Sequence, residues 1–266
     1  MHGETFDKPP LVEIVAEVKW GSTSLTIPFE GPNQSVPAEN TPDELYNRFE
    51  SAIAENDYTG VERLIPQGMP VMSHQPVYRY KKRKTGQDSE QTLYQLGSGI
   101  LSVHGIPPYK NWATFLPVLE AGINALSQAR SGPDQTFASV TLRYIDVFSD
   151  SLMEGRSLAQ FVENIFGISI SLPEAITKHC TNRDAIKSAL HLKVPTASGD
   201  TIAVTISEGR AGPHAGIVMD TAVQRLRETS VASVMTVFEE EHRVIHDMFI
   251  GMTRPIHTQM GLRETQ

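Results

Sequence analysis

The sequence predicts an α+β fold in which two tandem β-α-β-β-β-α units form a largely antiparallel, curled sheet packed on long helices. The main observation is that one order of elements (strand, helix, three strands, long helix) occurs in residues 1–132 and again in residues 133–266. In addition, short glycine-containing turns separate consecutive strands, as in antiparallel hairpins. A capping box also precedes the first helix of each half. We therefore expect a first unit at 1–132 and a second at 133–266, packed intimately as one structural domain.

The first half opens with a strand at residues 11–20, where side chains of two kinds alternate. The alternation predicts a half-buried strand whose inner face comprises Val12, Ile14, Ala16, Val18 and Trp20. After a proline-rich loop, we expect Thr41 to cap a helix that runs to about residue 55, with Glu44 closing the capping box. A proline-bounded linker is expected at residues 56–76.

The remaining elements follow in the same way. The first half continues with strands at residues 77–84, 91–96 and 99–104 and ends with a helix at 111–129. The second half is expected to contain a strand at 137–148, a helix capped by Ser157 with Gln160, an irregular stretch at 168–185, strands at 187–194, 201–207 and 215–220, and a last helix from Ser230 to about residue 250. The inward stripe of that last helix comprises Val234, Phe238, Ile245 and Phe249.

Composition narrows the class of protein. The chain has 266 residues, of which 39% are hydrophobic and 20% are charged, as in ordinary soluble globular proteins. Its net charge of −8 argues against strong nucleic-acid binding, because phosphate binding needs a basic field. Cys180 is the only cysteine, so no internal disulfide can form. With no long apolar run and no visible secretory signal, we expect a cytoplasmic protein without a membrane segment.

Several segments resemble one protein family. The opening Lys8-Pro9-Pro10-Leu11-Val12-Glu13, with Glu17, resembles the N-terminal signature of a sporadically distributed bacterial family of unknown function. Further matching segments follow in the family's order: Tyr109 with Trp112 and Phe115, Leu142-Arg143-Tyr144-Ile145-Asp146 with Asp in place of the family's Asn, Val218 to Asp220, and His242 to Phe249. The resemblance implies no activity, cofactor or catalytic residue. The family's scattered distribution implies an accessory or mobile gene, in genome defence or toxin neutralisation.

The last helix carries two histidines that could bind a metal ion. His242 and His246 are spaced so that both imidazoles lie on one helix face. Arg243 stands where a zinc protease motif requires glutamate, so the helix does not carry that motif. A helical wheel places His242 at the edge of the apolar stripe, which favours a hydrogen-bonded histidine at the border of the core. A metal or acid–base role and an interface role are the alternatives.

Two further groups are candidates for binding. In the strand at 137–148, Arg143 is expected on the face opposite the helices, whereas Tyr144 and Asp146 face the helices, where Asp146 would need a partner. These residues predict either a structural polar network or a binding site on the sheet. Tyr109, Trp112 and Phe115 open the long helix; core packing explains them, and an aromatic binding surface is the alternative, for which Tyr109 and Trp112 are the candidates.

Other motifs do not support an enzyme. The basic run is expected to be a solvated hairpin that protects a sheet edge, or else a grip for an acidic partner or nucleic acid; it comprises Arg79, Lys81, Lys82, Arg83 and Lys84. Gly97-Ser98-Gly99 lies between strands and lacks the third glycine of a dinucleotide site. Cys180 beside His179 is a poor nucleophile pair, because sequence neighbours seldom align for proton transfer. No catalytic residue, metal ligand set or cofactor is therefore predicted.

Three functions are compatible with these observations. The first is a non-enzymatic accessory factor that binds another protein, such as a toxin or a defence component, or that assembles as a homo-oligomer. The second is a metal-dependent hydrolase that uses His242 and His246 together with an acidic residue from elsewhere. The third is a small-ligand binder, since a sheet curled around a helix often leaves a groove.

Overall fold

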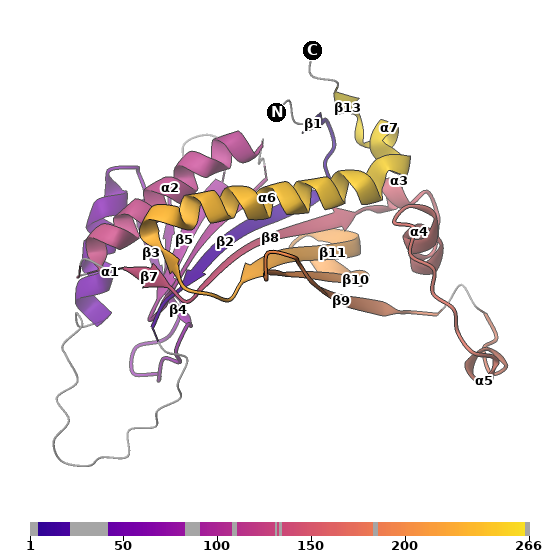
Figure 1. Cartoon of the computed structure of the whole chain (residues 1–266), viewed down its shortest axis with the longest axis horizontal. Helices are drawn as coiled ribbons and strands as arrows, with labels where there is room; N and C mark the ends of the chain where they lie inside the picture. Colours follow the sequence, from indigo (N-terminus) through magenta and orange to yellow (C-terminus); the bar gives the residue numbers. More distant parts are fainter. Residues whose placement is uncertain are drawn as a thin grey trace. The chain divides into compact units, whose positions relative to one another are not determined.

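The computed structural model describes residues 5–21, 42–82, 91–107, 111–130, 132, 135–182 and 186–263 (Figure 1). It combines helices with a large antiparallel sheet, as the sequence predicts. The chain divides into two compact units. Unit 1 comprises Met1–Ile14, Arg143–Gln224 and Glu240–Gln266, and unit 2 comprises Val15–Leu142 and Arg225–Glu239. Strands β2 (Leu11–Lys19) and β8 (Ser139–Phe148) and helix α6 (Val231–Thr253) contribute residues to both units.

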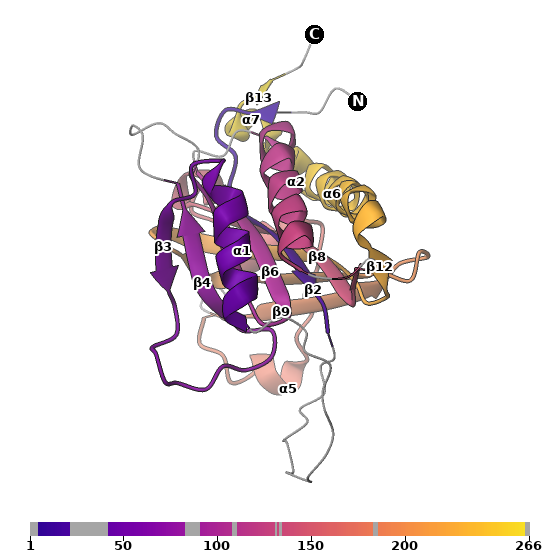
Figure 2. The ribbon, with the colours of Figure 1, turned by 90° about the vertical axis from the view of Figure 1, so that its left-hand side faces the viewer.

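In unit 2, six strands are ordered β3-β4-β5-β6-β2-β8. The first four strands in this order are β3 (Gly60–Arg63), β4 (Pro76–Lys81), β5 (Gln91–Gly97) and β6 (Ile100–Ile106). Neighbours among these four strands pair in antiparallel fashion. Helices α1 (Pro42–Ala54) and α2 (Trp112–Ala129) lie side by side over one face of these strands (Figure 2). The short strands β7 (Thr136–Phe137) and β12 (Thr229–Ser230) form a separate pair.

Aromatic rings fill the space between α1, α2 and the strands of unit 2. Phe49 of α1 contacts Tyr80 and Tyr94, with ring centroids 5.4 and 5.8 Å apart, and Tyr58 packs on Tyr94 at 4.4 Å. Tyr80 and Tyr94 are directly opposite in the β4–β5 register, so both rings project from the same face. Helix α2 approaches this face at Gly122, where a Cβ atom would lie 2.6 Å from the Tyr94 ring.

In unit 1, the strand order is β2-β8-β11-β10-β9. The last three strands are β11 (His214–Arg225), β10 (Thr201–Ala211) and β9 (Ala189–Pro195). The helical elements are α3 (Asp150–Met153), α4 (Leu158–Asn164), α5 (Glu174–Thr177), the later part of α6, the 3₁₀ turn η2 (Arg254–Ile256) and α7 (His257–Met260). One core joins α4 to β8, β10 and β11, and its largest rings are Phe148, Phe161 and Phe166. Near the chain ends, β1 (Thr5–Phe6) pairs with β13 (Leu262–Arg263).

Most long elements lie where the sequence places them. In β2, Ile14, Ala16 and Val18 are buried in alternation, which confirms the predicted face. Ser157 and Gln160 form both hydrogen bonds of the predicted capping box at α4. The Thr41 cap lies outside the described residues. That the two halves are repeats of one unit stays a prediction.

Two predictions about irregular regions are wrong. Residues 56–76 are not only a linker, because they include the edge strand β3, whose four residues are too few to show a period in the sequence. Residues 168–185 include the one-turn helix α5. The hairpin turn between β10 and β11 also differs, since β10 continues through Gly209 to Ala211 and the turn is formed by Gly212 and Pro213.

Candidate functional site

Tyr144 and the two histidines of α6 come together on the helix-covered face of unit 1. The Tyr144 hydroxyl and His242 Nδ1 share a hydrogen bond of 2.8 Å. The rings of His242 and His246 are nearly parallel, with centroids 5.8 Å apart. Burial, followed by the nearby His246 and Arg243, lowers the pKa of His242 to about 4. His242 is therefore neutral at pH 7 and half-buried, as predicted for a histidine at the edge of the core.

Asp146 lies on the same face of β8 as Tyr144, and only 3% of it is exposed. The sequence predicted a polar partner for this carboxyl. Within the described part of the chain, no hydrogen bond or ion pair supplies one. Instead, burial and then the negative charge of Asp220 raise the pKa of Asp146 to about 8. The carboxyl is therefore mostly protonated at pH 7, which avoids the cost of a buried charge.

Arg143 projects from the opposite face of β8, as the alternation predicts. Its Nε donates to Asp220 Oδ1 at 2.7 Å, and its Nη2 donates to Asp220 Oδ2 in a second, parallel bond. Thr205 is directly opposite Asp220, and His191 is directly opposite Thr205, with 3.1 Å between His191 Nδ1 and Thr205 Oγ1. Arg143 thus belongs to a polar row across four strands and is not part of one site with Tyr144 and Asp146.

Trp112 has a structural environment at the start of α2. Its Nε1 donates to Glu239 Oε2 at 3.2 Å, and its ring lies 5.9 Å from that of the buried Phe115. These contacts within unit 2 fit the docking role expected of this aromatic cluster. Tyr109, its third predicted member, lies outside the described residues.

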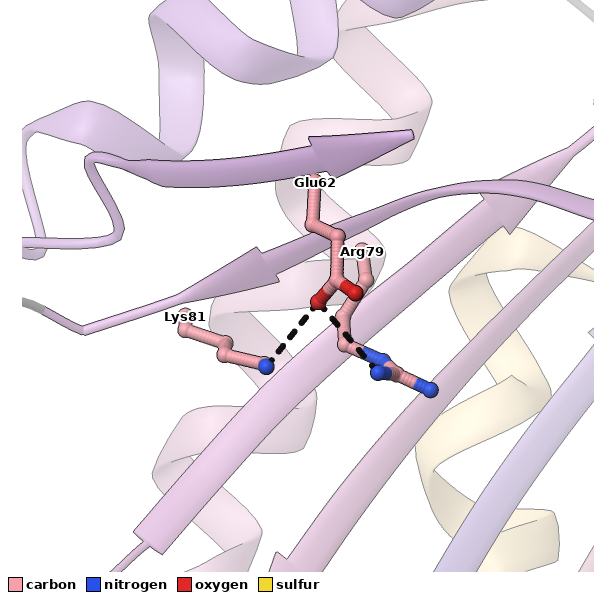
Figure 3. Close-up of polar contacts among 3 residues, drawn as sticks. All are labelled: Glu62, Arg79 and Lys81. Carbon is pink, nitrogen blue, oxygen red and sulfur yellow. Dashed lines mark hydrogen bonds and ion pairs between the residues drawn. The ribbon is translucent and has the colours of Figure 1, made fainter. Parts of the chain in front are cut away.

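The basic run is partly neutralised by an acidic residue from the edge strand. Glu62 of β3 is directly opposite Arg79 of β4 and accepts hydrogen bonds from Arg79 Nη1 at 3.3 Å and from Lys81 Nζ at 3.0 Å (Figure 3). The hydrogen bond and charge of Lys81, then those of Arg79, lower the pKa of Glu62. The Lys82 ammonium lies 5.2 Å from the centre of the Tyr58 ring. The other two predicted members, residues 83 and 84, lie outside the described residues.

A group of exposed apolar side chains lies immediately after β3. We call residues 64–75 the methionine loop. Met69 and Met72 are 58% and 67% exposed, and Val71 between them is also exposed, as is Val61 of β3. A large apolar side chain that stays in water costs free energy, so several in one short segment favour a surface that another molecule covers.

The methionine loop is nevertheless held firmly by its backbone. Leu64 N donates to Val77 O at 2.8 Å, and His74 N donates to Ser98 O at 2.9 Å. His74 Nε2 also donates to the Trp20 carbonyl oxygen at 3.1 Å. These bonds hold the two ends of the loop on other parts of unit 2, and Met72 N donates to Gln75 Oε1 at 3.0 Å between them, so the apolar side chains lie on an anchored backbone.

Gly97 explains why the loop can pack so closely. A Cβ atom at Gly97 would lie 1.9 Å from the carbonyl oxygen of Gln75, far inside contact distance. Gly99 in the same hairpin has φ +77, in the left-handed region that favours glycine. The Gly97-Ser98-Gly99 segment is therefore a structural hairpin, as expected, and it supports the methionine loop.

The sequence prediction missed this loop because it interpreted residues 56–76 as a proline-bounded linker. A signal was present. Prolines 66 and 70 bracket the first methionine, and Met69, Val71 and Met72 give the linker three large apolar residues within four positions. Polar residues dominate ordinary linkers, so this apolar content distinguishes the segment.

His242, His246 and Cys180 are the residues that the sequence analysis considered for metal or thiol chemistry. No group of three or more His, Cys, Asp or Glu side chains in that part of the chain is arranged to hold a metal ion, so His242 and His246 lack further ligands there. Cys180 Sγ donates to the Asn182 carbonyl oxygen at 3.0 Å, and this contact does not place a base beside the thiol. Among the described helices, none combines the length and apolar character that a membrane span requires.

Comparisons with known proteins add no family. No protein-family model matches the sequence, and no curated protein matches it. The resemblance to the sporadic bacterial family therefore stays a prediction.

Proposed function

We propose that this protein is a non-enzymatic factor that binds another protein, and that the methionine loop is its main contact. The observation that carries the proposal is the combination of exposed Met69, Val71 and Met72 with an anchored backbone. Fully burying one such side chain contributes about 1.5–3 kcal/mol, and an ordered loop loses little conformational entropy on binding. Methionine is well suited to this role because its unbranched chain adapts to irregular surfaces.

The charge of the β3–β4 hairpin that carries the loop indicates the chemistry of the partner. Residues 60–82 carry four basic side chains and one acidic side chain, Glu62, in a protein whose net charge is −8. The basic side chains are Arg63, Arg79, Lys81 and Lys82. A partner surface with an apolar centre and acidic side chains around it would complement both features, since opposite potentials steer association and select partners. The resemblance adds a context for such binding, in genome defence or toxin neutralisation.

The test compares two matched double variants in an affinity pull-down from the source cells. Met69→Ser/Met72→Ser removes exposed apolar surface from the loop. Ile170→Ser/Ile176→Ser removes similarly exposed apolar surface elsewhere. We expect a protein recovered with the wild type to be lost with the first variant and retained with the second, while both variants keep the wild-type melting temperature. Equal recovery with both variants would contradict the proposal.

A further inference from the structure

Strand β9 forms the outer edge of the sheet in unit 1 (Figure 1). It pairs with β10 from Ala189 to Pro195, and no other described strand pairs with it. All seven residues of the strand are exposed except Leu190, which is half-buried. An edge of this length presents backbone N–H and C=O groups that an additional strand can bind.

One face of β9 continues the core of unit 1. This face of β9 carries Leu190, Leu192 and Val194. Their direct partners on β10 are, in the same order, Ile206, Val204 and Ile202. The first two partners belong to the core and the third packs against it. Leu192 and Val194 are nevertheless 37% and 49% exposed, because the sheet ends beside them. A strand added at this edge would bury both side chains with apolar residues of its own.

The other face of β9 carries one basic side chain, Lys193. His191 and Lys193 project from it, opposite Thr205 and Ala203 of β10. The nearest acidic residue in this register is Asp220, one strand further in, and Arg143 binds it through two hydrogen bonds. An acidic side chain placed opposite Lys193 on an added strand would therefore meet an ammonium group, and opposite charges on adjacent strands stabilise pairing.

We propose that β9 accepts an extended segment of a partner protein, with alternating apolar and acidic residues, as an additional strand. The apolar residues would cover Leu192 and Val194, and the acidic residues would lie beside His191 and Lys193. This inference extends the proposed protein-binding function to a second surface, in unit 1, and does not depend on the methionine loop.

A second copy of the chain is a poor occupant of this edge. When two β9 strands pair antiparallel with their apolar faces on the same side, one residue lies opposite its own copy at the centre of the pair. That central residue can be His191, Leu192 or Lys193. The first centre places His191 opposite His191 of the other copy, the second places His191 opposite Lys193, and the third places Lys193 opposite Lys193. The third arrangement sets two ammonium groups directly against each other, which disfavours pairing, and none of the three places an acidic side chain opposite Lys193.

Two fluorescent peptides of equal length test the proposal: one alternates valine with glutamate and the other alternates valine with lysine. Fluorescence anisotropy should show about fivefold tighter binding of the glutamate peptide, as a reversal of the cross-strand charge contact at Lys193 implies. His191→Glu/Lys193→Glu should reverse that preference, and Leu192→Ser/Val194→Ser should weaken both peptides. The glutamate peptide should also slow amide hydrogen exchange in residues 189–195.

Met69→Ser/Met72→Ser serves as the control, because it should bind the glutamate peptide as the wild type does. Failure of this control alone would place the peptide on the methionine loop and overturn the inference. Equal affinity for the two peptides, or the same preference after the charge reversal, would also overturn it. So would a concentration-dependent dimer that protects residues 189–195 without peptide, because the occupant would then be a second copy.

Discussion

Replacing Asp146 by asparagine should stabilise the protein, with a gain that depends on pH. The ordinary pKa of this carboxyl is 3.8, and burial raises it to about 8 in the folded state. Between these values the folded state retains a proton that the unfolded chain has released, so stability falls as pH rises from about 4 to 8. Asparagine has nearly the shape of the protonated carboxyl but does not ionise. The variant should therefore not lose stability as the pH rises.

The expected gain follows from the two pKa values. A difference of one pKa unit corresponds to about 1.4 kcal/mol, so Asp146→Asn should gain about 4 kcal/mol at pH 7 and close to zero at pH 4. Urea unfolding at several pH values between 4 and 8.5 measures this gain directly. Asp247→Asn, at an exposed position of α6, is the matched control and should change little. A gain that does not vary with pH, or a loss of stability at pH 8, would refute the reasoning.

Four other substitutions test the described contacts by thermal or urea unfolding. Phe238→Ala should destabilise by about 3–5 kcal/mol, because the ring is fully buried, whereas Phe249→Ala should cost about 1–3 kcal/mol, because that ring is only partly buried. An equal loss at both sites would show that the inner face of α6 is misassigned. Tyr144→Phe removes the hydrogen bond to His242 and should cost about 1–2 kcal/mol; an unchanged free energy of unfolding would mean that water replaces the hydroxyl. Gly97→Ala should destabilise by at least about 2 kcal/mol and expose the methionine loop to proteolysis, while a wild-type melting temperature would contradict the close packing there.

Much of the fold could be predicted because the long elements carry a clear period. The alternation in β2 and the side on which Arg143 and Tyr144 project follow directly from the two-residue repeat of a strand. The capping box at Ser157 depends on residues three apart, so it is also visible locally. The short strand β3 has no such signal, because pairing with β4 determines it.

The partners of the candidate residues could not be predicted in the same way. Tyr144 and His242 are 98 positions apart, and Arg143 and Asp220 are 77 apart, so their contacts depend on the tertiary fold. The same limit explains Asp146, since its side could be predicted from the alternation but the absence of a described partner could not. The methionine loop was missed for another reason: prolines favoured a linker interpretation, and the backbone bonds that anchor it are not visible in the sequence.

Site-specific photo-crosslinking in the source cells tests the protein-binding proposal most directly. A benzoylphenylalanine at position 72, in the methionine loop, should give a discrete crosslinked product with one partner protein after irradiation. The same group at position 176, which is also an exposed apolar site, should not give that product. Excess unlabelled wild type should compete for the partner, and Met69→Ser/Met72→Ser should not. The absence of a product at position 72, or the same product from both positions, would contradict the role proposed for the methionine loop.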